Sequence, residues 1–280
     1  MYQKFKWTHV SEERNRLLKQ YEPLQLFLFY EFAKALTIDS FIDVGANVGT
    51  YSIIVSSLHN VKAVHAFEPS PRTFEELRQN VQLNEHAKQK VAIYKKAVSN
   101  TAGEATFGIV SDYSGANSIM ETSIHDAAVL TNRVTVERIS LDEVVHLSSK
   151  AIGLKIDVEG HEKEVLYGAK NLLCNNKAIV QLEDYSGRNA NVQNILRNCG
   201  YERILVIGPD NYFTNVREVL TDKAVLRACE DAARDLIEDN LETESAERPI
   251  RVNLLSGLNF EISGKIANLA RTARNALRRH

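Results

Sequence analysis

An apolar strand that runs directly into a glycine-rich turn constrains the fold of this chain more than any other feature. Residues 41–49 have the sequence FIDVGANVG, in which Asp43, Gly45, Asn47 and Gly49 alternate with apolar residues, and a helix-like segment follows. Glycine lets the backbone turn sharply and approach a ligand, and the N–H groups at the start of a helix point toward an anionic group. The pattern predicts a strand–loop–helix unit that binds a nucleoside-containing ligand.

The chemistry of this loop and of the next strand narrows the choice of ligand. The spacing differs from the G-x-G-x-x-G of dinucleotide enzymes, and an acid and an amide stand among the glycines, which suits the amino acid end of S-adenosylmethionine. A second strand, AVHAF at 63–67, ends in Glu68, about twenty residues after the glycines, where an acid meets ribose hydroxyls in a βαβ unit. We therefore expect the four loop residues to bind S-adenosylmethionine with Glu68 on the ribose. The alternative for Glu68 is a solvated acid that caps the next helix.

Composition excludes several classes of protein. The chain has 280 residues, of which 44% are hydrophobic and 25% charged, as in globular proteins with a substantial core. A formal net charge of −2 argues against a general nucleic-acid binder, which needs a concentrated basic face. Cys174, Cys199 and Cys229 are odd in number and scattered, so neither a disulfide framework nor a thiolate zinc site is expected. Because the first residues lack the apolar core of a signal peptide, we expect a cytoplasmic protein.

The remaining segments alternate between predicted helices and strands, which indicates a parallel sheet. Helices are expected at 24–36, where the helix is either buried or a lid, and at 70–84 and 163–173. Strands are expected at 91–94, 104–110, 133–139, 153–156, 178–182, 201–207 and 212–216. The last two bracket Gly-Pro-Asp-Asn at 208–211, which fits a hairpin loop. The sheet should therefore be mixed and finish with an antiparallel strand.

Several segments, in this order, resemble the FkbM-type S-adenosylmethionine-dependent methyltransferases. They are FIDVGANVGTYS, AFEPSPRTFEELRQNVQLN, Ser140-Leu141-Asp142, and LKIDVEGHEKEVLYGA with the later Leu182-Glu183. The resemblance covers roughly 41–183, about half of the chain. It implies an α/β, Rossmann-like class I methyltransferase fold, with a mixed seven-stranded sheet, a terminal antiparallel strand and helices on both faces. It also implies S-adenosylmethionine as the cofactor and methyl transfer to oxygen on a sugar, polyketide or related metabolite.

Three regions are expected along the chain: an N-terminal helical cap or lid over 1–40, the methyltransferase core over 41–220, and a C-terminal helical extension over 221–280. Within the extension, residues 261–280 place apolar side chains on one helical stripe with basic residues around it. Such a basic amphipathic helix lies on an anionic membrane surface, binds a partner, or packs on its own domain or on a second subunit of a homodimer. The small apolar face favours packing.

Methyl transfer to an alcohol needs in-line alignment of the reacting groups and a group that takes the hydroxyl proton. The segment after the fourth strand supplies Asp157, Glu159, His161 and Glu162 where the methyl should point. His161 is the preferred general base, because an unperturbed imidazole titrates near neutral pH. Asp157 is the alternative base, or it binds the ammonium of the cofactor. In a purely structural alternative, Glu159 and His161 form the first turn of the next helix and complement its dipole.

Acids at the ends of two neighbouring strands leave a metal-assisted variant open. Asp157, Glu159, Glu183 and Asp184 are suitable hard oxygen ligands for Mg²⁺, which some O-methyltransferases outside this family use to hold the acceptor. Glu183 is otherwise an acceptor contact, a helix cap or a solvated acid. Asp142 has a simpler interpretation as the cap of a helix.

Two further segments are expected to contact the ligands. A polar stretch over 111–132 is the candidate acceptor loop, and Ser118 within it is a hydrogen-bonding candidate for a sugar, although turn chemistry explains it equally well. Ala97 and Val98 follow the third strand at the level of the adenine, where backbone contacts are expected.

The leading functional hypothesis is O-methylation of a hydroxyl on a sugar, glycan or related metabolite. A methyltransferase for nitrogen or nucleic acid is the second hypothesis, but KIDVEGHE at 155–162 differs from the Asn/Asp-Pro-Pro-aromatic turn of amino methyltransferases. A non-catalytic cofactor-binding scaffold docked through the basic tail is the third, and the acidic and histidine cluster argues against it. We expect a small-molecule, sugar or glycan acceptor, no specific nucleic acid, and a cytoplasmic location, peripheral to the inner membrane face if the tail binds lipid.

Overall fold

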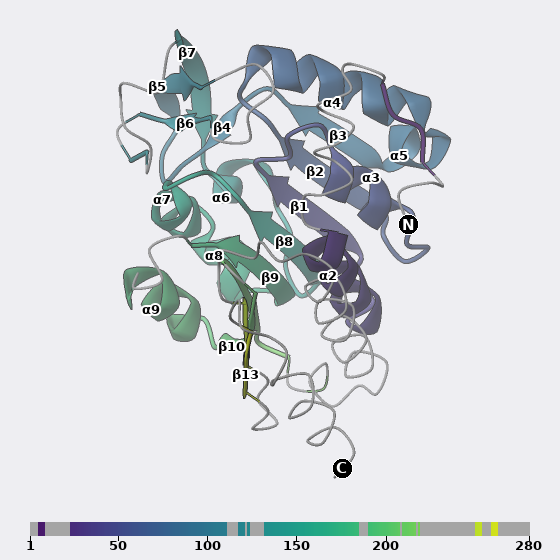
Figure 1. Cartoon of the computed structure of the whole chain (residues 1–280), viewed down its shortest axis with the longest axis vertical. Helices are drawn as coiled ribbons and strands as arrows, with labels where there is room; N and C mark the ends of the chain where they lie inside the picture. The colour runs from purple at the N-terminus through teal and green to yellow at the C-terminus, as the bar shows by residue number, and fades with distance from the viewer. Residues whose placement is uncertain are drawn as a thin grey trace.

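The computed structural model describes residues 5–8, 23–110, 117–120, 122–123, 132–184, 190–207, 209–216, 218, 250–253 and 259–262. Within them, a central sheet is covered by helices on both faces, and a smaller sheet lies to one side of it (Figure 1). This arrangement confirms the predicted Rossmann-like α/β fold class.

The central sheet has seven strands in the order β10-β11-β9-β8-β1-β2-β3. Their bounds are β1 Ser40–Val44, β2 Ala63–Phe67, β3 Val91–Tyr94, β8 Ala151–Ile156, β9 Lys177–Glu183, β10 Glu202–Ile207 and β11 Asp210–Thr214. The five neighbouring strands β9, β8, β1, β2 and β3 pair in parallel. In contrast, β11 is antiparallel to both β9 and β10. The predicted antiparallel strand is thus confirmed: it is the last strand of this sheet along the chain, and it lies inside the sheet with β10 at the edge.

The hairpin between β10 and β11 is tighter than predicted. Asp210 and Asn211, expected in the loop, belong to β11 and pair with Glu183 and Leu182 of β9. The turn propensity of a Pro-Asp-Asn sequence is a weak local preference, and ladder pairing with the buried strand β9 overrides it.

One face of the sheet is covered by helices α2 Pro23–Ala35, α3 Thr50–Ser56, α4 Pro71–Leu83 and α5 Glu85–Lys90 (Figure 1). The helix predicted over 70–84 is confirmed as α4, with Ser70 at the N-cap and proline at its first position. Buried Leu28, Phe29 and Phe32 place α2 in the hydrophobic core with the first strands. The helix expected at 24–36 is therefore a packed helix; residues 9–22 of the expected cap lie outside the described part of the chain.

The opposite face is covered by α6 Leu141–Val144, α7 Glu162–Tyr167, α8 Lys170–Cys174 and α9 Ala190–Asn198. The prediction of one helix over 163–173 is wrong, because the helix is interrupted at Gly168, between α7 and α8. A Cβ at Gly168 would overlap the backbone carbonyl of Ser99, so the break allows two backbones to meet. Asp142 is a helix cap as predicted, but of α8: its carboxylate accepts hydrogen bonds of 2.8 Å from the N–H groups of Asn171 and Leu172.

A disulfide joins Cys174 at the end of α8 to Cys199 after α9, 25 residues further along the chain. The expectation that the cysteines form no disulfide is therefore wrong. Their spacing in the sequence contains no signal that two helix ends on the same face meet. Cys229 lies outside the described residues.

The smaller sheet is built from the segment between β3 and β8, in the order β4-β7-β5-β6. Its strands are β4 Ala97–Val98, β5 Gly103–Ile109, β6 Ser118–Ile119 and β7 Asn132–Ile139. The strands predicted at 104–110 and 133–139 are confirmed as β5 and β7, and they pair with each other as antiparallel strands. Their inward side chains, including Phe107, Ile119 and Val136, form a separate small core.

The C-terminal region contains a hairpin of β12 Ile250–Asn253 and β13 Asn259–Ile262, with β12 beside β10. Glu261 and Ile262 belong to β13, so the prediction of a helix beginning at residue 261 is wrong at its start. Residues 263–280 lie outside the described part. Among the helices of the described part, none has the length and apolarity needed to span a membrane.

Candidate active site

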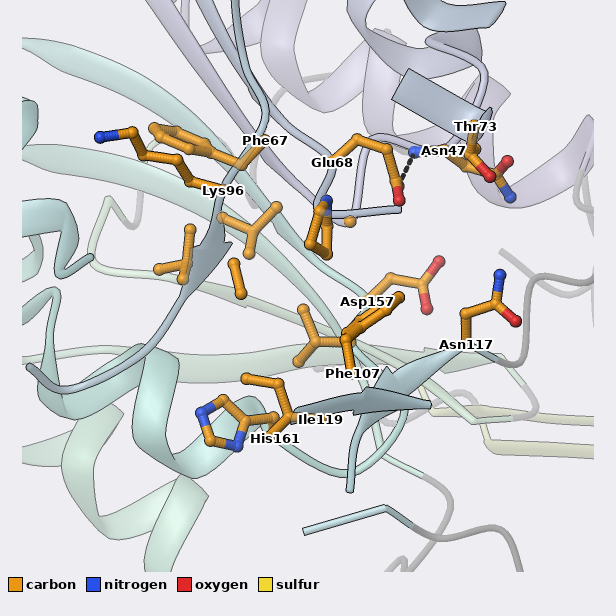
Figure 2. Close-up of a pocket in the computed structure, with 16 residues that line it drawn as sticks. Asn47, Phe67, Glu68, Thr73, Lys96, Phe107, Asn117, Ile119, Asp157 and His161 are labelled. Atoms are coloured by element: carbon orange, nitrogen blue, oxygen red, sulfur yellow. Dashed lines mark hydrogen bonds between the residues drawn. The ribbon is translucent and has the colours of Figure 1, made fainter. Parts of the chain in front are cut away.

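A cavity lies at the carboxyl ends of β1, β2 and β8, the edge where open α/β sheets bind ligands. The main sheet contributes Gly45, Asn47, Phe67, Glu68, Asp157 and His161 to its wall. The small sheet closes the other side with Phe107, Asn117 and Ile119 (Figure 2). The cavity therefore lies between the two sheets.

The glycine loop after β1 has the backbone that its sequence predicts. Gly45 and Gly49 have positive φ angles of 79° and 89°. A Cβ at Gly45 would overlap the backbone carbonyl of Asp157, and a Cβ at Gly49 would lie 2.5 Å from Leu77 Cδ1. Glycine at position 45 thus lets the loop after β1 touch the loop after β8 directly.

Glu68 closes β2 and fixes the glycine loop. Its buried carboxylate accepts a hydrogen bond of 2.9 Å from Asn47 N, drawn in Figure 2, and another of 2.9 Å from Ser70 N at the start of α4. The side chain lies on the cavity wall and also binds the N-cap residue, so the helix-cap alternative is confirmed, with the carboxylate buried rather than solvated. Its contact with a ribose stays a prediction.

Asp43 lies beneath the loop and is fully buried, so it supports the cavity from below, whereas Gly45 and Asn47 line it. The hydroxyl of Ser52 donates to its Oδ2 at 2.6 Å. Burial raises the pKa of Asp43 above its usual value, although the charge of Lys155 and the bond from Ser52 act in the opposite direction.

Three carboxylates converge after β8 and β9. Asp157, Glu159 and Glu183 offer oxygen atoms that lie within 4.8 Å of one another, while Asp184 is outside this group. Burial disfavours the ionised form of Asp157, but the charge of Lys155 and hydrogen bonds with Glu183 and Lys155 hold its pKa below the usual value. The Lys155–Asp157 ion pair is 2.8 Å long. Three of the four acids that the sequence offered as possible metal ligands thus lie close together, which their spacing in the sequence could not show.

Glu159 adopts a left-handed backbone, with φ of 55°, and is buried. Such a conformation costs a non-glycine residue about 1–3 kcal/mol and persists where the surrounding structure enforces it. Gly160, with φ of 110°, follows it, so the turn directs the Glu159 carboxylate toward Asp157.

His161 lies on the cavity wall at the N-cap of α7 and is buried. Its Nδ1 is 2.7 Å from the hydroxyl of Thr122, and its Nε2 is 3.0 Å from the hydroxyl of Ser99. The catalytic and the helix-start interpretations of its position are therefore compatible. The sequence did not single out Thr122, because only its general placement in a polar segment was visible there.

Glu162 is buried beside this group. Its Oε1 accepts a hydrogen bond of 2.9 Å from Gly160 N. Burial raises its pKa to about 7, and the charges of Asp157 and Asp184 contribute in the same direction.

Of the other residues predicted to contact the cofactor or the acceptor, some line the cavity and others do not. Ala97 and Val98 line the cavity. The neighbouring Lys96 lies beside Phe67, at the end of the cavity opposite Asn117 (Figure 2). Ser118 is buried in the small sheet, where its hydroxyl donates to Ser123 Oγ at 2.7 Å, and the wall is formed by its neighbours. The neighbouring Asn117 lines the cavity, and its Oδ1 accepts a hydrogen bond of 2.9 Å from Val110 N.

Comparison with known proteins places these residues in a family. The model of the methyltransferase FkbM domain matches residues 43–203, more than half of the chain. The chain is similar to hexuronic acid methyltransferase AglP of Haloferax volcanii, with 35% identity over 133 residues that cover 47% of this chain and 50% of AglP. It is also similar to 31-O-demethyl-FK506 methyltransferase FkbM of Streptomyces tacrolimicus, with 27% identity over 212 residues that cover 65% of this chain and 79% of that protein.

Among solved structures, methyltransferase FkbM from Methylobacillus flagellatus KT aligns with a TM-score of 0.47 and 13% identity, over 64% of this chain and 44% of that chain. The match with AglP spans half of that relative's length. The matched range 43–203 contains the glycine loop, the end of β2 and the acidic and histidine segment after β8. The chain therefore belongs to the FkbM family of S-adenosylmethionine-dependent methyltransferases and has their class I fold.

Proposed function

We propose that the protein is an O-methyltransferase that methylates a hydroxyl of a sugar, glycan or related small metabolite. The observation that carries the proposal is a single cavity that joins the glycine loop and Glu68 to Asp157 and the buried His161. The relatives named for a hexuronic acid and for 31-O-demethyl-FK506 support an oxygen acceptor on a small molecule or a sugar.

The cavity wall suits S-adenosylmethionine along its length. Apolar Phe67 and Val98 would contact the adenine, Glu68 would bind the ribose, and Gly45 and Asn47 would hold the amino acid end. Bound there, the cofactor supplies an electrophilic methyl group on a sulfonium. Asp157, whose pKa is lowered, is ionised at neutral pH and would pair with the ammonium of the cofactor.

His161 is the proposed general base. Ser99 fixes one ring nitrogen, and the other already faces a hydroxyl, that of Thr122, at 2.7 Å. A base whose second nitrogen is oriented by another group follows the general arrangement of activated hydroxyls. An acceptor hydroxyl that replaced Thr122 at Nδ1 would gain the methyl on its oxygen as the methyl–sulfur bond of the cofactor breaks, which releases S-adenosylhomocysteine, and Nδ1 would take the proton from the O–H bond.

A divalent cation is the second part of the proposal. Asp157, Glu159 and Glu183 form a hard oxygen donor set of the kind that Mg²⁺ binds. There the ion would lower the pKa of the acceptor hydroxyl and orient it. Glu159 would then act as a ligand and Glu183 would also lie beside the acceptor.

The test is a single-turnover assay with S-adenosylmethionine and a panel of uronic acids, neutral sugars and macrolide polyols, with methyl ethers identified by mass spectrometry. We expect His161→Ala to slow methyl transfer by about 10²–10⁴-fold with cofactor affinity retained. His146→Ala, at an exposed position two residues after the end of α6 and away from the residues that line the cavity, is the matched control and should keep the wild-type rate.

Chelation followed by Mg²⁺ addition tests the divalent cation separately from the His161 base. Loss and recovery of activity would establish the metal, and indifference to the chelator would remove it. A folded His161→Ala protein with the wild-type rate would exclude the base role. Methylation of nitrogen compounds or nucleic acid in place of the hydroxyl panel would overturn O-methylation itself.

A further inference from the structure

We propose that Asn80 positions the cofactor loop and couples it to residues 5–8, which we call the N-terminal strap. The inference rests on the proposed binding of the cofactor at the glycine loop, and it assigns a role to a residue that does not line the cavity. Asn80 lies on the buried face of α4 and is 2% exposed.

The amide of Asn80 uses both of its ends. Its Nδ2 donates to the backbone carbonyl of Val48 at 2.9 Å. Its Oδ1 accepts from Thr8 N at 2.8 Å and from Thr8 Oγ1 at 3.1 Å. One planar group therefore fixes the distance between the loop after β1 and a segment 72 residues away in the sequence.

Val48 is the central residue of the part of the loop that must keep its shape. On one side of it, Asn47 N is held by the carboxylate of Glu68, and on the other, Gly49 lies against Leu77. The bond from Asn80 to the Val48 carbonyl is thus the third restraint on three successive residues. Because Asn47 lines the cavity, a shift of the Val48 carbonyl would move the loop backbone that forms part of the proposed cofactor site.

A second asparagine makes the role of Asn80 testable. Asn84, four residues further at the C-cap of α4, accepts from Lys6 N at 3.0 Å and donates to Lys6 O at 2.8 Å, so it holds the same strap. Its other bond, of 2.8 Å, goes to the backbone carbonyl of Asn80. Both side chains are buried and both bind the strap, but within the described part of the chain only Asn80 also binds the glycine loop.

The strap is packed as well as hydrogen-bonded. Phe5 and Trp7 contact a hydrophobic cluster beneath α3, α4 and α5, and the centre of the Phe5 ring lies 5.5 Å from that of the His86 ring. Removing the strap would take away both donors of Asn80 Oδ1, so the amide would no longer be held in this orientation. The Val48 carbonyl would then lose its restraint. Strap attachment and cofactor binding should consequently favour each other.

The experiment compares two matched substitutions by calorimetric binding of S-adenosylhomocysteine. Asn80→Asp and Asn84→Asp each keep an acceptor for the strap and each lose the Nδ2 donor. We expect Asn80→Asp to weaken binding at least ten-fold and Asn84→Asp to change it less than two-fold, at similar melting temperatures. A merely structural role predicts that affinity falls in both variants in proportion to the loss of stability, and that result would overturn the inference.

A second pair protects the test against misfolding of the helix variants. Thr8→Pro removes the N–H that reaches Asn80, and Lys6→Pro removes the N–H that reaches Asn84, both in the half-exposed strap. Thr8→Pro should weaken binding several-fold more than Lys6→Pro, and equal effects would contradict the coupling. If the wild-type protein itself fails to bind S-adenosylhomocysteine, the proposed cofactor site fails, which is distinct from normal wild-type binding with no effect of Asn80→Asp.

Discussion

Buried polar side chains form a row across the sheet directly beneath the cavity. Asp43, Lys155 and Gln181 occupy paired positions on β1, β8 and β9. The Lys155 ammonium lies 5.0 Å from the ring centre of Tyr51, whose hydroxyl accepts a hydrogen bond of 3.0 Å from Gln181 Nε2. Lys155 thus balances the charges of the acids around it. The ion pair between the buried Lys155 and Asp157 is costly to break, because the remaining charge loses its partner.

Glu162 makes the stability of the protein depend on pH. The pKa of Glu162 is about 7 in the folded protein, compared with an ordinary value of 4.5 that applies to the unfolded chain. Between pH 4.5 and pH 7 the folded state therefore holds a proton that the unfolded state has lost. Stability should therefore be greatest below pH 4.5 as far as this residue is concerned and fall as pH rises to about 7. A shift of this size corresponds to roughly 3 kcal/mol.

Glu162→Gln should abolish that loss, because the amide stays neutral and its oxygen can still accept the bond from Gly160 N. Urea unfolding of both proteins at pH 5, 6, 7 and 8 measures the effect as a difference, which cancels the other titrating groups. We expect the variant to gain stability relative to wild type over this range. A difference that stays constant from pH 5 to pH 8 would contradict the assignment.

At the scale of elements, local pattern predicted most strands and the start of α4, because alternating and helical periodicity are encoded within a few residues. The glycine loop, Glu68 and the segment after β8 were predictable for the same reason: each follows a recognisable strand. Periodicity does not encode which distant segments meet. The pairing of Thr122 with His161, of Thr8 with Asn80, and of Cys174 with Cys199 therefore required the structure.

The bridge between α8 and α9 should stabilise the face of the sheet that these helices cover. Closing a loop of 25 residues in the unfolded chain corresponds to about 3 kcal/mol in the chain-entropy account. Cys174→Ser should lose this amount in denaturant unfolding under oxidising conditions, and the difference from wild type should vanish with a phosphine reductant. Cys229→Ser is the control and should match wild type in both conditions. A loss in Cys174→Ser that persists in the reductant would assign the effect to packing instead.

At the scale of the whole molecule, the two sheets meet at the cavity: most inward side chains of the small sheet form their own cluster, while Val98 and Ile139 join the core of the main sheet. The seven-stranded sheet supplies the glycine loop and the acids, and the small sheet supplies the apolar wall of Phe107 and Ile119. The sequence indicated the strands of the small sheet but assigned them no separate layer, since alternation alone does not show which sheet a strand joins.

The tail after β13 carries the last prediction. Its basic residues are Lys265, Arg271, Arg274, Arg278 and Arg279. If the tail holds the enzyme near a lipid-linked acceptor, electrostatics must supply most of the attachment, at about 1 kcal/mol per basic residue near an anionic leaflet. Because the hairpin of β12 and β13 ends at Ile262, a chain ending there keeps every described element and removes only the tail.

Sedimentation with vesicles of phosphatidylserine and phosphatidylcholine compares this shortened chain with the full one. We expect the full chain to bind anionic vesicles more strongly, to ignore neutral ones, and to dissociate as salt screens the charges. Replacing Arg271 and Arg274 by glutamine should weaken binding by an intermediate amount, because it removes two of these five basic residues and leaves the length and the apolar stripe of the tail unchanged. Equal partitioning of the full and shortened chains, or binding indifferent to lipid charge and salt, would assign residues 263–280 to packing or dimer contacts, which analytical ultracentrifugation of the two chains would then distinguish.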